Sequence, residues 1–591
     1  MTGPSSSEKS HPARSAVTRS LAGIAAAGRS EVWISRFADE VVYAEADRID
    51  DAASSGIELP LVGLTFAVKD NIDVAGLPTT AGCPDFAYLP ALDAPAVHAL
   101  IDAGAVCIGK TNLDQFATGL VGTRSPYGAV RNAVDPTRIS GGSSSGSAVA
   151  VALGLVDLAL GTDTAGSGRI PAALNGVVGI KATFGLVSTE GTVPACASFD
   201  CVSVFARDVA LAERAMAELT GPRGHASDRR AYPGDVPLGL PLRPIIARPS
   251  AEVLGVLDPS RRANYGAALM HLERLGCEVV EMDLGPFLRA GLLLYQGAFV
   301  AERYDSVGEW IDAHRDQVDP TVGAIISAAR ELRASDLASD VARLTRLRTA
   351  AAEEWRRVRA TTLLLPTTAI HPTLAEVAED PVGKNTELGH FTTFLNLLDM
   401  CAVSVPFGSC EGLPFGLSCI GPAFTDLVQA DVASLLEPGG SRAGVVDRSW
   451  SASCGGRPAP PGIPLVVVGA HLSGQPLNHQ LSERGGRLLA AVHTAEAYRL
   501  YALDTAPPKP GLVRVSSGGR SIAAEVWELP PCGFADFVAD VPPPLAVGSV
   551  LLTGGTCLPG FLCEPMALET AADITDYGGW RPYLNSRTSG G

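Results

Sequence analysis

The chain has 591 residues, of which 46% are hydrophobic and 18% charged, and its formal net charge is −17. This length exceeds one ordinary hydrophobic core, so we expect at least two domains. The composition is typical of a well-buried soluble protein, and the acidic charge argues against nucleic-acid or anionic-membrane partners. The twelve cysteines lie scattered without a C-x-x-C pair. Such spacing favours reduced thiols in the cytoplasm over a disulfide framework or a zinc site.

Helical and strand-like patterns alternate over the first 425 residues. The segments expected to be helical are 21–27, 96–103, 148–160 and 328–359, and those expected to be strands are 64–68, 105–108 and 363–365. This alternation predicts an α/β fold with helices on both faces of a sheet. We interpret 21–27 as the start of a surface helix rather than a signal peptide. The longest apolar stretch, 148–160, is too short to cross a bilayer.

A change in composition marks the predicted domain boundary. Glycine and proline dominate two stretches between residues 426 and 462, which we interpret as a linker. We therefore expect one domain at 1–425 and a second at 463–591. The second begins with an apolar strand at 464–469, and its pattern predicts a small, β-rich α+β domain.

Two short motifs suggest other chemistries. Residues 104–111 fit the phosphate-binding pattern G-x-x-x-x-G-K-T, but the four central residues are strand-like and the preceding stretch is helical, so ATP binding is disfavoured. Residues 142–146 fit G-x-S-x-G, which would make Ser144 the nucleophile of an α/β-hydrolase with His371 or His390 as partner. That interpretation leaves the lysine and the second serine motif described next without roles.

Two Gly/Ser-rich stretches and one lysine form a more complete chemical set. Ser143 lies in GGSSSGS and Ser167 in GTDTAGSGR, 24 residues apart, while Lys69 follows an apolar strand. His98 is the only histidine between residues 60 and 208, and it is far from these motifs in sequence. A serine nucleophile here therefore requires a lysine base, whose pKa burial can lower toward neutrality.

The segment 141–172, GGSSSGSAVAVALGLVDLALGTDTAGSGRIPA, resembles the amidase signature family. The resemblance implies that Ser167 is the nucleophile, Ser143 a bridging serine that follows a cis peptide bond, and Lys69 the base. It also implies a large mixed central sheet covered by helices on both faces, and amide hydrolysis with no metal or organic cofactor. An oxyanion hole is expected from four backbone N–H groups, those of Thr164, Ala165, Gly166 and Ser167.

Other residues of the second serine motif have expected structural roles. Asp163 and Arg169 are expected to hold the glycine-rich loop by hydrogen bonds. Gly166 and Gly168 are expected to let the backbone approach the substrate.

Two further segments narrow the substrate. Residues 294–304, LYQGAFVAERY, and 114–124, DQFATGLVGTR, resemble allophanate hydrolases. The resemblance implies that Tyr295 and Arg303 hold a substrate carboxylate, and a guanidinium suits this task because it donates two parallel hydrogen bonds. Phe299 stands where the resemblance leads us to expect tryptophan, a change that should leave anion binding intact.

The last part of the chain supports the same interpretation. Residues 470–474 and 559–565 resemble the extra domain of allophanate hydrolases, and the resemblance implies that His471 takes part in decarboxylating the first product. The expected function is hydrolysis of allophanate, a small molecule, to ammonia and carbon dioxide in urea degradation, through a covalent acyl-enzyme. A homodimer and coupling to a biotin-dependent urea carboxylase are also expected.

Three alternatives stay open from the sequence. The first is an amidase for another small carboxylated amide, similar to biuret or malonamate. The second is a component of a glutamine-dependent amidotransferase, against which the extra domain and the acidic charge argue. The third is a non-catalytic scaffold, which the intact serine–lysine set disfavours.

Overall fold

The computed structural model describes residues 11–440 and 462–588. The chain divides into two compact units. The described residues of the first unit are 11–231 and 245–439, and those of the second are 232–244, 440 and 462–588. The second unit thus includes a segment from the middle of the chain, which the sequence pattern did not reveal. Most of the predicted linker, 441–461, lies outside the described residues.

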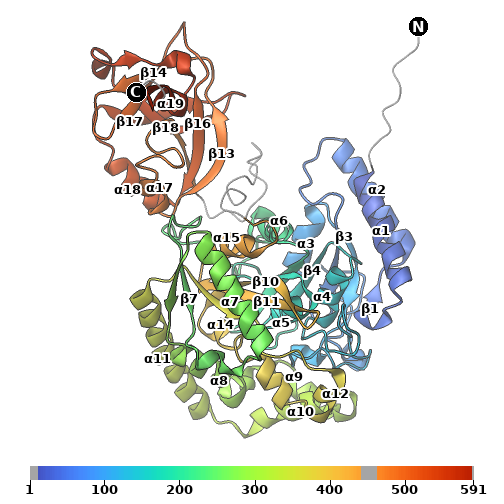
Figure 1. The fold of residues 1–591 in the computed structure, drawn as a ribbon. Helices are drawn as coiled ribbons and strands as arrows, with labels where there is room; N and C mark the ends of the chain where they lie inside the picture. Colours follow the sequence, from blue (N-terminus) through green and yellow to red (C-terminus); the bar gives the residue numbers. More distant parts are fainter. Residues whose placement is uncertain (1–10, 441–461, 589–591) are drawn as a thin grey trace, which may run out of the picture. The chain divides into compact units, whose positions relative to one another are not determined.

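An eleven-stranded sheet forms the centre of the first unit (Figure 1). In spatial order its strands are β1 (Trp33–Arg36), β3 (Val106–Thr111), β2 (Thr65–Lys69), β4 (Leu158–Asp163), β6 (Cys201–Ala206), β5 (Val178–Lys181), β10 (Met400–Cys410), β11 (Leu413–Pro422), β9 (Thr362–Pro366), β7 (Ile245–Arg248) and β8 (Glu278–Glu281). β2 pairs in parallel with β3 and β4, and β7 with β8 and β9, whereas the other neighbours are antiparallel. The expectation of a large mixed sheet is confirmed.

Helices cover both faces of this sheet (Figure 1). One face carries α4 (Ser145–Ala152) and α5 (Ile170–Asn175), and the other carries α3 (Pro95–Asp102), α6 (Val209–Thr220) and α15 (Asp426–Leu436). The remaining helices are α1 (Pro12–Ala27), α2 (Asp39–Ser54), α7 (Pro259–Arg274), α8 (Gly285–Gln296), α9 (Ala301–Ala313), α10 (Pro320–Ser327), α11 (Ala334–Val358), α12 (Leu374–Glu379), α13 (Gly383–Leu388) and α14 (Phe394–Leu397).

Long apolar runs were the hardest segments to assign from sequence. The helix expected over 148–160 is wrong in its second half, because α4 ends at Ala152 and β4 begins at Leu158. Gly154, with φ 65°, adopts the left-handed conformation that commonly follows a helix end. A continuous apolar run does not by itself distinguish a buried helix from a buried strand.

Helix α15 occupies the beginning of the predicted linker. Its residues from Leu427 to Leu436 are all buried, and the helix contacts β10 and β11. The first unit therefore continues to Gly439, past the boundary that we expected at residue 425.

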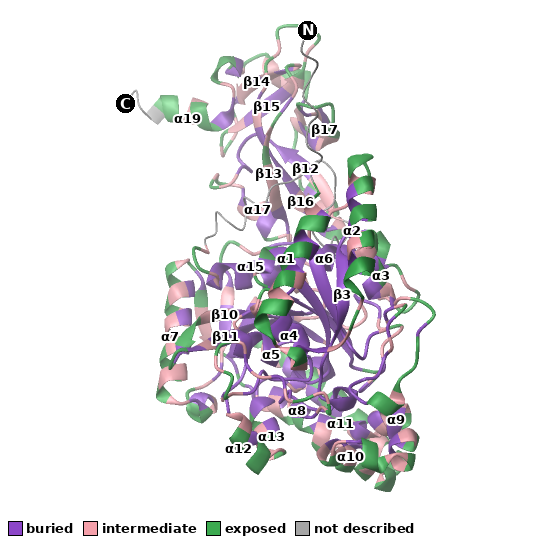
Figure 2. Cartoon of the chain, turned by 90° about the vertical axis from the view of Figure 1, so that its right-hand side faces the viewer, coloured by how far each residue is buried: buried purple, intermediate pink, exposed green. Residues whose placement is uncertain are grey.

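Three neighbouring strands, β2, β3 and β4, are buried along their whole length, and Figure 2 shows β3 among the buried parts. They run in parallel, so their carboxyl ends meet at one edge of the sheet. Each strand ends in a polar residue, namely Lys69, Thr111 and Asp163. In sheets of this kind, ligands bind beyond the carboxyl ends of the strands.

The second unit contains a five-stranded and a three-stranded sheet. In spatial order the strands are β13 (Arg487–His493), β16 (Ala523–Leu529), β12 (Ile463–Val467), β18 (Cys557–Cys563) and β17 (Leu545–Leu551), and then β15 (Lys509–Arg514), β14 (Tyr498–Leu503) and β19 (Ala572–Asp573). Its helices are α17 (His479–Ser482), α18 (Pro531–Ala539) and α19 (Trp580–Thr588). The expected β-rich domain is confirmed.

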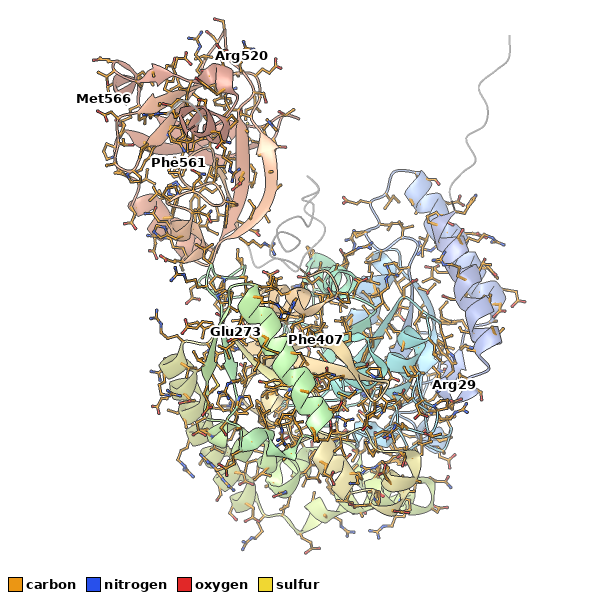
Figure 3. The ribbon with its side chains drawn as sticks, viewed as in Figure 1. Arg29, Glu273, Phe407, Arg520, Phe561 and Met566 are labelled. Carbon is orange, nitrogen blue, oxygen red and sulfur yellow. The ribbon has the colours of Figure 1, made fainter. Side chains whose placement is uncertain are left out.

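The core of the second unit gathers side chains from both sheets, including Trp527, Tyr498 and Phe561, of which Figure 3 labels Phe561. The segment 232–244 is hydrogen-bonded to this unit through the backbone. Leu238 N–H donates to the Gly485 carbonyl at 2.8 Å, and Cys532 N–H donates to the Gly234 carbonyl at 3.0 Å.

Candidate active site

The edge at which β2 and β4 end brings the predicted lysine and bridging serine together. Lys69 ends β2, and Ser143 lies two residues before α4. Both side chains are fully buried, and the peptide bond between Gly142 and Ser143 is cis. Lys69 Nζ is 2.8 Å from Ser143 Oγ and 2.7 Å from Thr162 Oγ1, and both hydroxyl oxygens accept hydrogen bonds from it. Thr162 belongs to the second serine motif, yet sequence reasoning did not single it out.

The surroundings of Lys69 change its acidity. Burial lowers the pKa of Lys69 from 10.5 to about 7. Three buried carboxylates raise this pKa again in part, those of Asp114, Asp200 and Asp163, whereas the Arg303 guanidinium lowers it. At pH 7 roughly half of the lysine is then neutral, against about one molecule in 3,000 at the ordinary pKa. A neutral amine can accept a proton from a hydroxyl, so Lys69 has the property that a base requires.

The loop between β4 and α5 carries Ser167, whose side chain is 3% exposed. Asp163 and Arg169 hold this loop, as we expected. Asp163 accepts hydrogen bonds from Gly168 N–H at 3.0 Å and from Arg169 Nε and Nη2 at 2.9 and 2.8 Å. Both partners of this ion pair are fully buried. The pair fixes both ends of the loop, and neither side chain is left free for chemistry.

At two positions of this loop, neighbouring atoms leave no room for a side chain larger than that of glycine. A Cβ atom on Gly166 would lie 2.4 Å from Thr392 Oγ1, and one on Gly168 would lie 2.6 Å from the Ser203 Cβ atom. Gly166 also has φ 133°, which L side chains rarely adopt. Thr392 Oγ1 donates to the Ala165 carbonyl at 2.7 Å.

The expectation that four backbone N–H groups form the oxyanion hole is wrong for one of them. Gly166 N–H donates to Asp163 Oδ1 at 3.0 Å, so it is already engaged within the loop. Within the part of the chain that the structure describes, the N–H groups of Thr164, Ala165 and Ser167 donate to no other residue. Sequence reasoning missed this difference because all four groups lie in one short motif.

Asp200 is a second residue that the sequence analysis missed. Its carboxylate is fully buried and accepts hydrogen bonds from Thr164 Oγ1 at 2.5 Å and from Ala195 N–H and Cys196 N–H at 2.8 and 3.0 Å. Burial raises the pKa of Asp200, while these hydrogen bonds and the Arg303 guanidinium oppose that change. Asp200 therefore joins the loop that carries Ser167 to the segment that follows β5.

The two residues expected to bind a carboxylate lie together. Arg303 of α9 is 1% exposed, and its Nη2 donates to the hydroxyl of Tyr295, from α8, at 3.4 Å. Nη1 donates to Thr118 Oγ1 at 3.1 Å. Among the described residues, the hydrogen bonds of Arg303 go to these two hydroxyl oxygens, its Nε has no hydrogen-bond partner, and its charge acts on the Asp200 carboxylate. Because the Arg303 charge also lowers the pKa of Lys69, the two residues share one electrostatic environment.

The two disfavoured motifs have structural explanations. Residues 106–111 of the G-x-x-x-x-G-K-T pattern are strand β3, and Lys110 is buried in an ion pair with Asp70 at 3.3 Å. Ser144 Oγ donates to the Thr162 carbonyl at 3.1 Å and accepts from Thr162 N–H at 3.3 Å. Neither group is available for a nucleotide phosphate or for attack on a substrate.

His471 lies in an aromatic cluster of the second unit. Its ring stacks on Phe561 with centroids 5.1 Å apart and meets Phe537 edge to face at 5.2 Å. Nε2 is 3.0 Å from Gln480 Oε1. Burial lowers the pKa of His471, so the imidazole is neutral at pH 7.

Three general features of the described ranges concern disulfide bonds, metal sites and membrane-spanning helices. None of the eleven cysteines that these ranges contain is joined to another of them by a disulfide bond. No group of acidic, histidine and cysteine side chains within residues 11–440 and 462–588 has the arrangement of a metal site. Over the same residues, no helix is long and apolar enough to cross a membrane.

Comparison with known families accounts for most of the chain. A family model described as Amidase matches residues 16–427, and a model described as Allophanate hydrolase C-terminal domain matches residues 463–585. The chain belongs to the amidase family.

Individual relatives fall into two groups. The curated urea amidolyase of Saccharomyces cerevisiae is 41% identical over 559 residues, which cover 89% of this chain but 30% of that protein. A glutamyl-tRNA(Gln) amidotransferase component of Symbiobacterium thermophilum is 35% identical over 425 residues, which cover 67% of this chain and 86% of that protein. This chain therefore spans less than a third of the curated urea amidolyase.

A solved structure matches both units. The crystallised allophanate hydrolase of Kluyveromyces lactis has a TM-score of 0.84 and 39% identity, with 98% of this chain and 97% of that chain covered. The urea amidolyase of the same organism has the same TM-score, with 98% of this chain and 36% of that chain covered.

Proposed function

We propose that this protein hydrolyses allophanate to ammonia and carbon dioxide and serves urea degradation. The observation that carries the proposal is Arg303, a buried guanidinium whose hydrogen bonds within the described residues go to hydroxyl oxygens, in the electrostatic environment of a lysine with a pKa of about 7. An amide that bears a carboxylate fits both features. The likeness to an allophanate hydrolase over both units supports the same substrate.

The proposed chemistry begins with proton transfer. Neutral Lys69 accepts a proton from Ser143 as Ser143 accepts one from Ser167. Ser167 Oγ then bonds to the carbonyl carbon that bears the terminal amino group. The oxyanion receives hydrogen bonds from the backbone N–H groups of Thr164, Ala165 and Ser167, which donate to no other described residue.

Collapse of this tetrahedral intermediate completes the first half of the reaction. The proton returns through Ser143 to the amino nitrogen, the C–N bond breaks, and ammonia leaves. Water then attacks the acyl-enzyme with the same Lys69–Ser143 relay, and Ser167 leaves as its hydroxyl. The product is N-carboxycarbamate, which takes up two protons and breaks down to two molecules of carbon dioxide and a second ammonia.

Arg303 and Tyr295 are proposed to hold the substrate carboxylate. A buried guanidinium with free donors binds a carboxylate strongly, because charge-assisted hydrogen bonds are shorter and stronger than neutral ones. The Tyr295 hydroxyl accepts from Arg303 Nη2, so its own proton is available for the same carboxylate.

The second unit is proposed to assist the loss of carbon dioxide through His471. Its imidazole is neutral because burial lowers its pKa, and a neutral ring nitrogen can accept a proton. The packing of the ring against Phe561 and Phe537 also fits a purely structural role. Comparing the yield of carbon dioxide from wild type and His471→Ala at early times decides between the two.

Functional coupling to a biotin-dependent urea carboxylase, which would supply the substrate, is part of the proposal. It is motivated by the length of the urea amidolyases, about two thirds of which has no counterpart here. A homodimer and a cytoplasmic location stay predictions from the sequence.

The proposal is tested by ammonia release from the purified protein with allophanate, urea, glutamine and simple amides. Allophanate should be preferred over each of the others by at least ~100-fold, because it alone carries a carboxylate one nitrogen away from the carbonyl that is attacked, where Arg303 can bind it. Glutamine is the substrate to compare most closely, because the relatives include components of glutamyl-tRNA(Gln) amidotransferases. A preference for glutamine or for an uncharged amide would overturn the proposal.

Ser167→Ala supplies the mechanistic half of this test. Loss of the nucleophile should lower the rate by at least ~1,000-fold without unfolding the protein. Ser145→Ala is a matched control, because Ser145 is a buried hydroxyl near Ser143 that bonds only weakly, to the Asn112 carbonyl at 3.3 Å. Similar losses in both variants would argue against Ser167 as the nucleophile.

A further inference from the structure

An unusual turn lies next to the carboxylate-binding arginine. The turn, Gln115–Gly119, contains Phe116 and Ala117, whose φ values are 50° and 52°. Two consecutive non-glycine residues in the left-handed region are uncommon, because the Cβ atom crowds the backbone there. Such backbone persists where the surroundings fix it, and it concentrates at ligand sites.

Hydrogen bonds hold the first end of this turn. Asp114 N–H donates to the Ser143 carbonyl at 3.2 Å. The next residue, Gln115, donates its N–H to the Arg124 carbonyl at 2.8 Å and accepts from Asp319 N–H through Oε1 at 2.6 Å. The turn is therefore fixed at one end to the bridging serine, and its left-handed residues carry the chain from there toward Arg303.

This turn places Thr118 in contact with Arg303. Its side chain is fully buried, and Oγ1 accepts from Arg303 Nη1 at 3.1 Å while donating to the Phe116 carbonyl at 3.2 Å. The same hydroxyl thus ties the guanidinium to the left-handed turn. On the other side, Arg303 Nη2 is held more loosely, by the Tyr295 hydroxyl at 3.4 Å.

We infer that Thr118 is a positioning residue that orients Arg303 for the substrate carboxylate and thereby sets the preference for charged amides. The inference rests on the proposed role of Arg303. An Arg303 side chain held by Tyr295 alone could rotate, and a rotated guanidinium presents one donor to a carboxylate rather than two. Thr118 is in contact with Arg303 and acts on the substrate only through it.

The experiment compares allophanate with biuret, which replaces the carboxylate by an uncharged amide of similar shape. Thr118→Val keeps the side-chain shape and removes the hydroxyl. We expect the KM for allophanate to rise about tenfold with kcat within about twofold, because one of the two hydrogen bonds that orient Arg303 is lost. Activity on biuret should stay within twofold, and Thr118→Ser should restore the KM for allophanate.

A structural threonine would give another pattern. If Thr118→Val lowered kcat on both substrates equally, or if its KM for allophanate stayed unchanged, the inference would be overturned. Should Thr118→Val fail to fold, Thr118→Ala and Thr118→Ser provide the same comparison, since these two variants differ by one hydroxyl. A tenfold higher KM in the alanine variant than in the serine variant is then the expected result, and equal values overturn the inference.

Arg303→Ala separates this inference from the proposed function. If Arg303→Ala leaves the preference for allophanate intact, the proposed role of Arg303 fails and the inference falls with it. If Arg303→Ala removes the preference while Thr118→Val does not, only the role of Thr118 fails. In the Arg303→Ala background, adding Thr118→Val should change KM by less than twofold, because the group that Thr118 positions is already absent.

Discussion

Replacing Lys69 by methionine is expected to change how the stability of the protein depends on pH. Lys69 has a pKa of about 7 in the folded protein and an ordinary value of 10.5. Between these values the unfolded chain keeps a proton that the folded protein has released, so wild-type stability rises with pH in this window. Each pH unit contributes about 1.4 kcal/mol. From pH 7 to pH 9 the gain is about 2 kcal/mol, because half of the folded molecules still hold the proton at pH 7.

The assay is the free energy of unfolding in guanidinium chloride for wild type and Lys69→Met at pH 7, 8 and 9. Other titrating groups cancel in the difference between the two proteins, so the wild type should gain about 2 kcal/mol over the variant. Lys384→Met is the control, because Lys384 pairs with Glu387 and its pKa is raised, away from this window. A Lys69 difference that stays flat from pH 7 to pH 9 would refute the argument for a neutral, buried base.

Three further results are expected. The rate of allophanate hydrolysis should fall about tenfold per pH unit below pH 7. Asp200→Asn should shift this acid limb of the pH–rate profile to lower pH, because the Asp200 carboxylate raises the Lys69 pKa. An acid limb at the same pH in both proteins contradicts this. Arg303→Ala should raise the KM for allophanate by an amount that corresponds to about 2–4 kcal/mol of binding free energy, and it should leave the KM for biuret unchanged. Equal increases for both substrates would show that Arg303 has a structural role. A protein ending at residue 461 should still release ammonia from allophanate, since the amidase site precedes residue 440; a folded, inactive truncation would show that the second unit completes the site.

Local motifs explain what the sequence could predict. Lys69 was recognisable because an apolar strand ends in a charged residue, and the structure has it at the buried end of β2. The loop after β4 was equally recognisable, because Asp163 and Arg169 are six residues apart and bond within the loop. Such short-range patterns depend on few other parts of the chain.

Contacts between distant segments explain what could not be predicted. Thr118 and Arg303 are 185 residues apart, and nothing in the sequence near Thr118 indicates their hydrogen bond. Asp200 meets Thr164 over 36 residues, through a pairing of strands that periodicity alone does not give. The assignment of 232–244 to the second unit likewise depends on backbone hydrogen bonds to residues more than 200 positions away.

The charges of the candidate site link substrate choice to the strength of the base. The carboxylates of Asp163 and Asp200 accept hydrogen bonds from donors of the protein, whereas the hydrogen bonds of Arg303 within the described residues go to hydroxyl oxygens. A buried cation that is hydrogen-bonded only to neutral groups is costly, so a ligand that brings a carboxylate is favoured over one that does not. The carboxylate of the proposed substrate therefore supplies a negative charge that pairs with Arg303.

Binding of that carboxylate should also act on Lys69. The Arg303 charge lowers the Lys69 pKa, and a bound carboxylate offsets this charge. The Lys69 pKa should then be higher in the substrate complex than in the free enzyme, which makes the neutral amine a stronger base. The profile of kcat against pH reports the complex and that of kcat/KM the free enzyme, so the acid limb of kcat should lie at higher pH. With biuret the two limbs should coincide, and a separation of equal size for both substrates would show that the carboxylate does not act through Arg303.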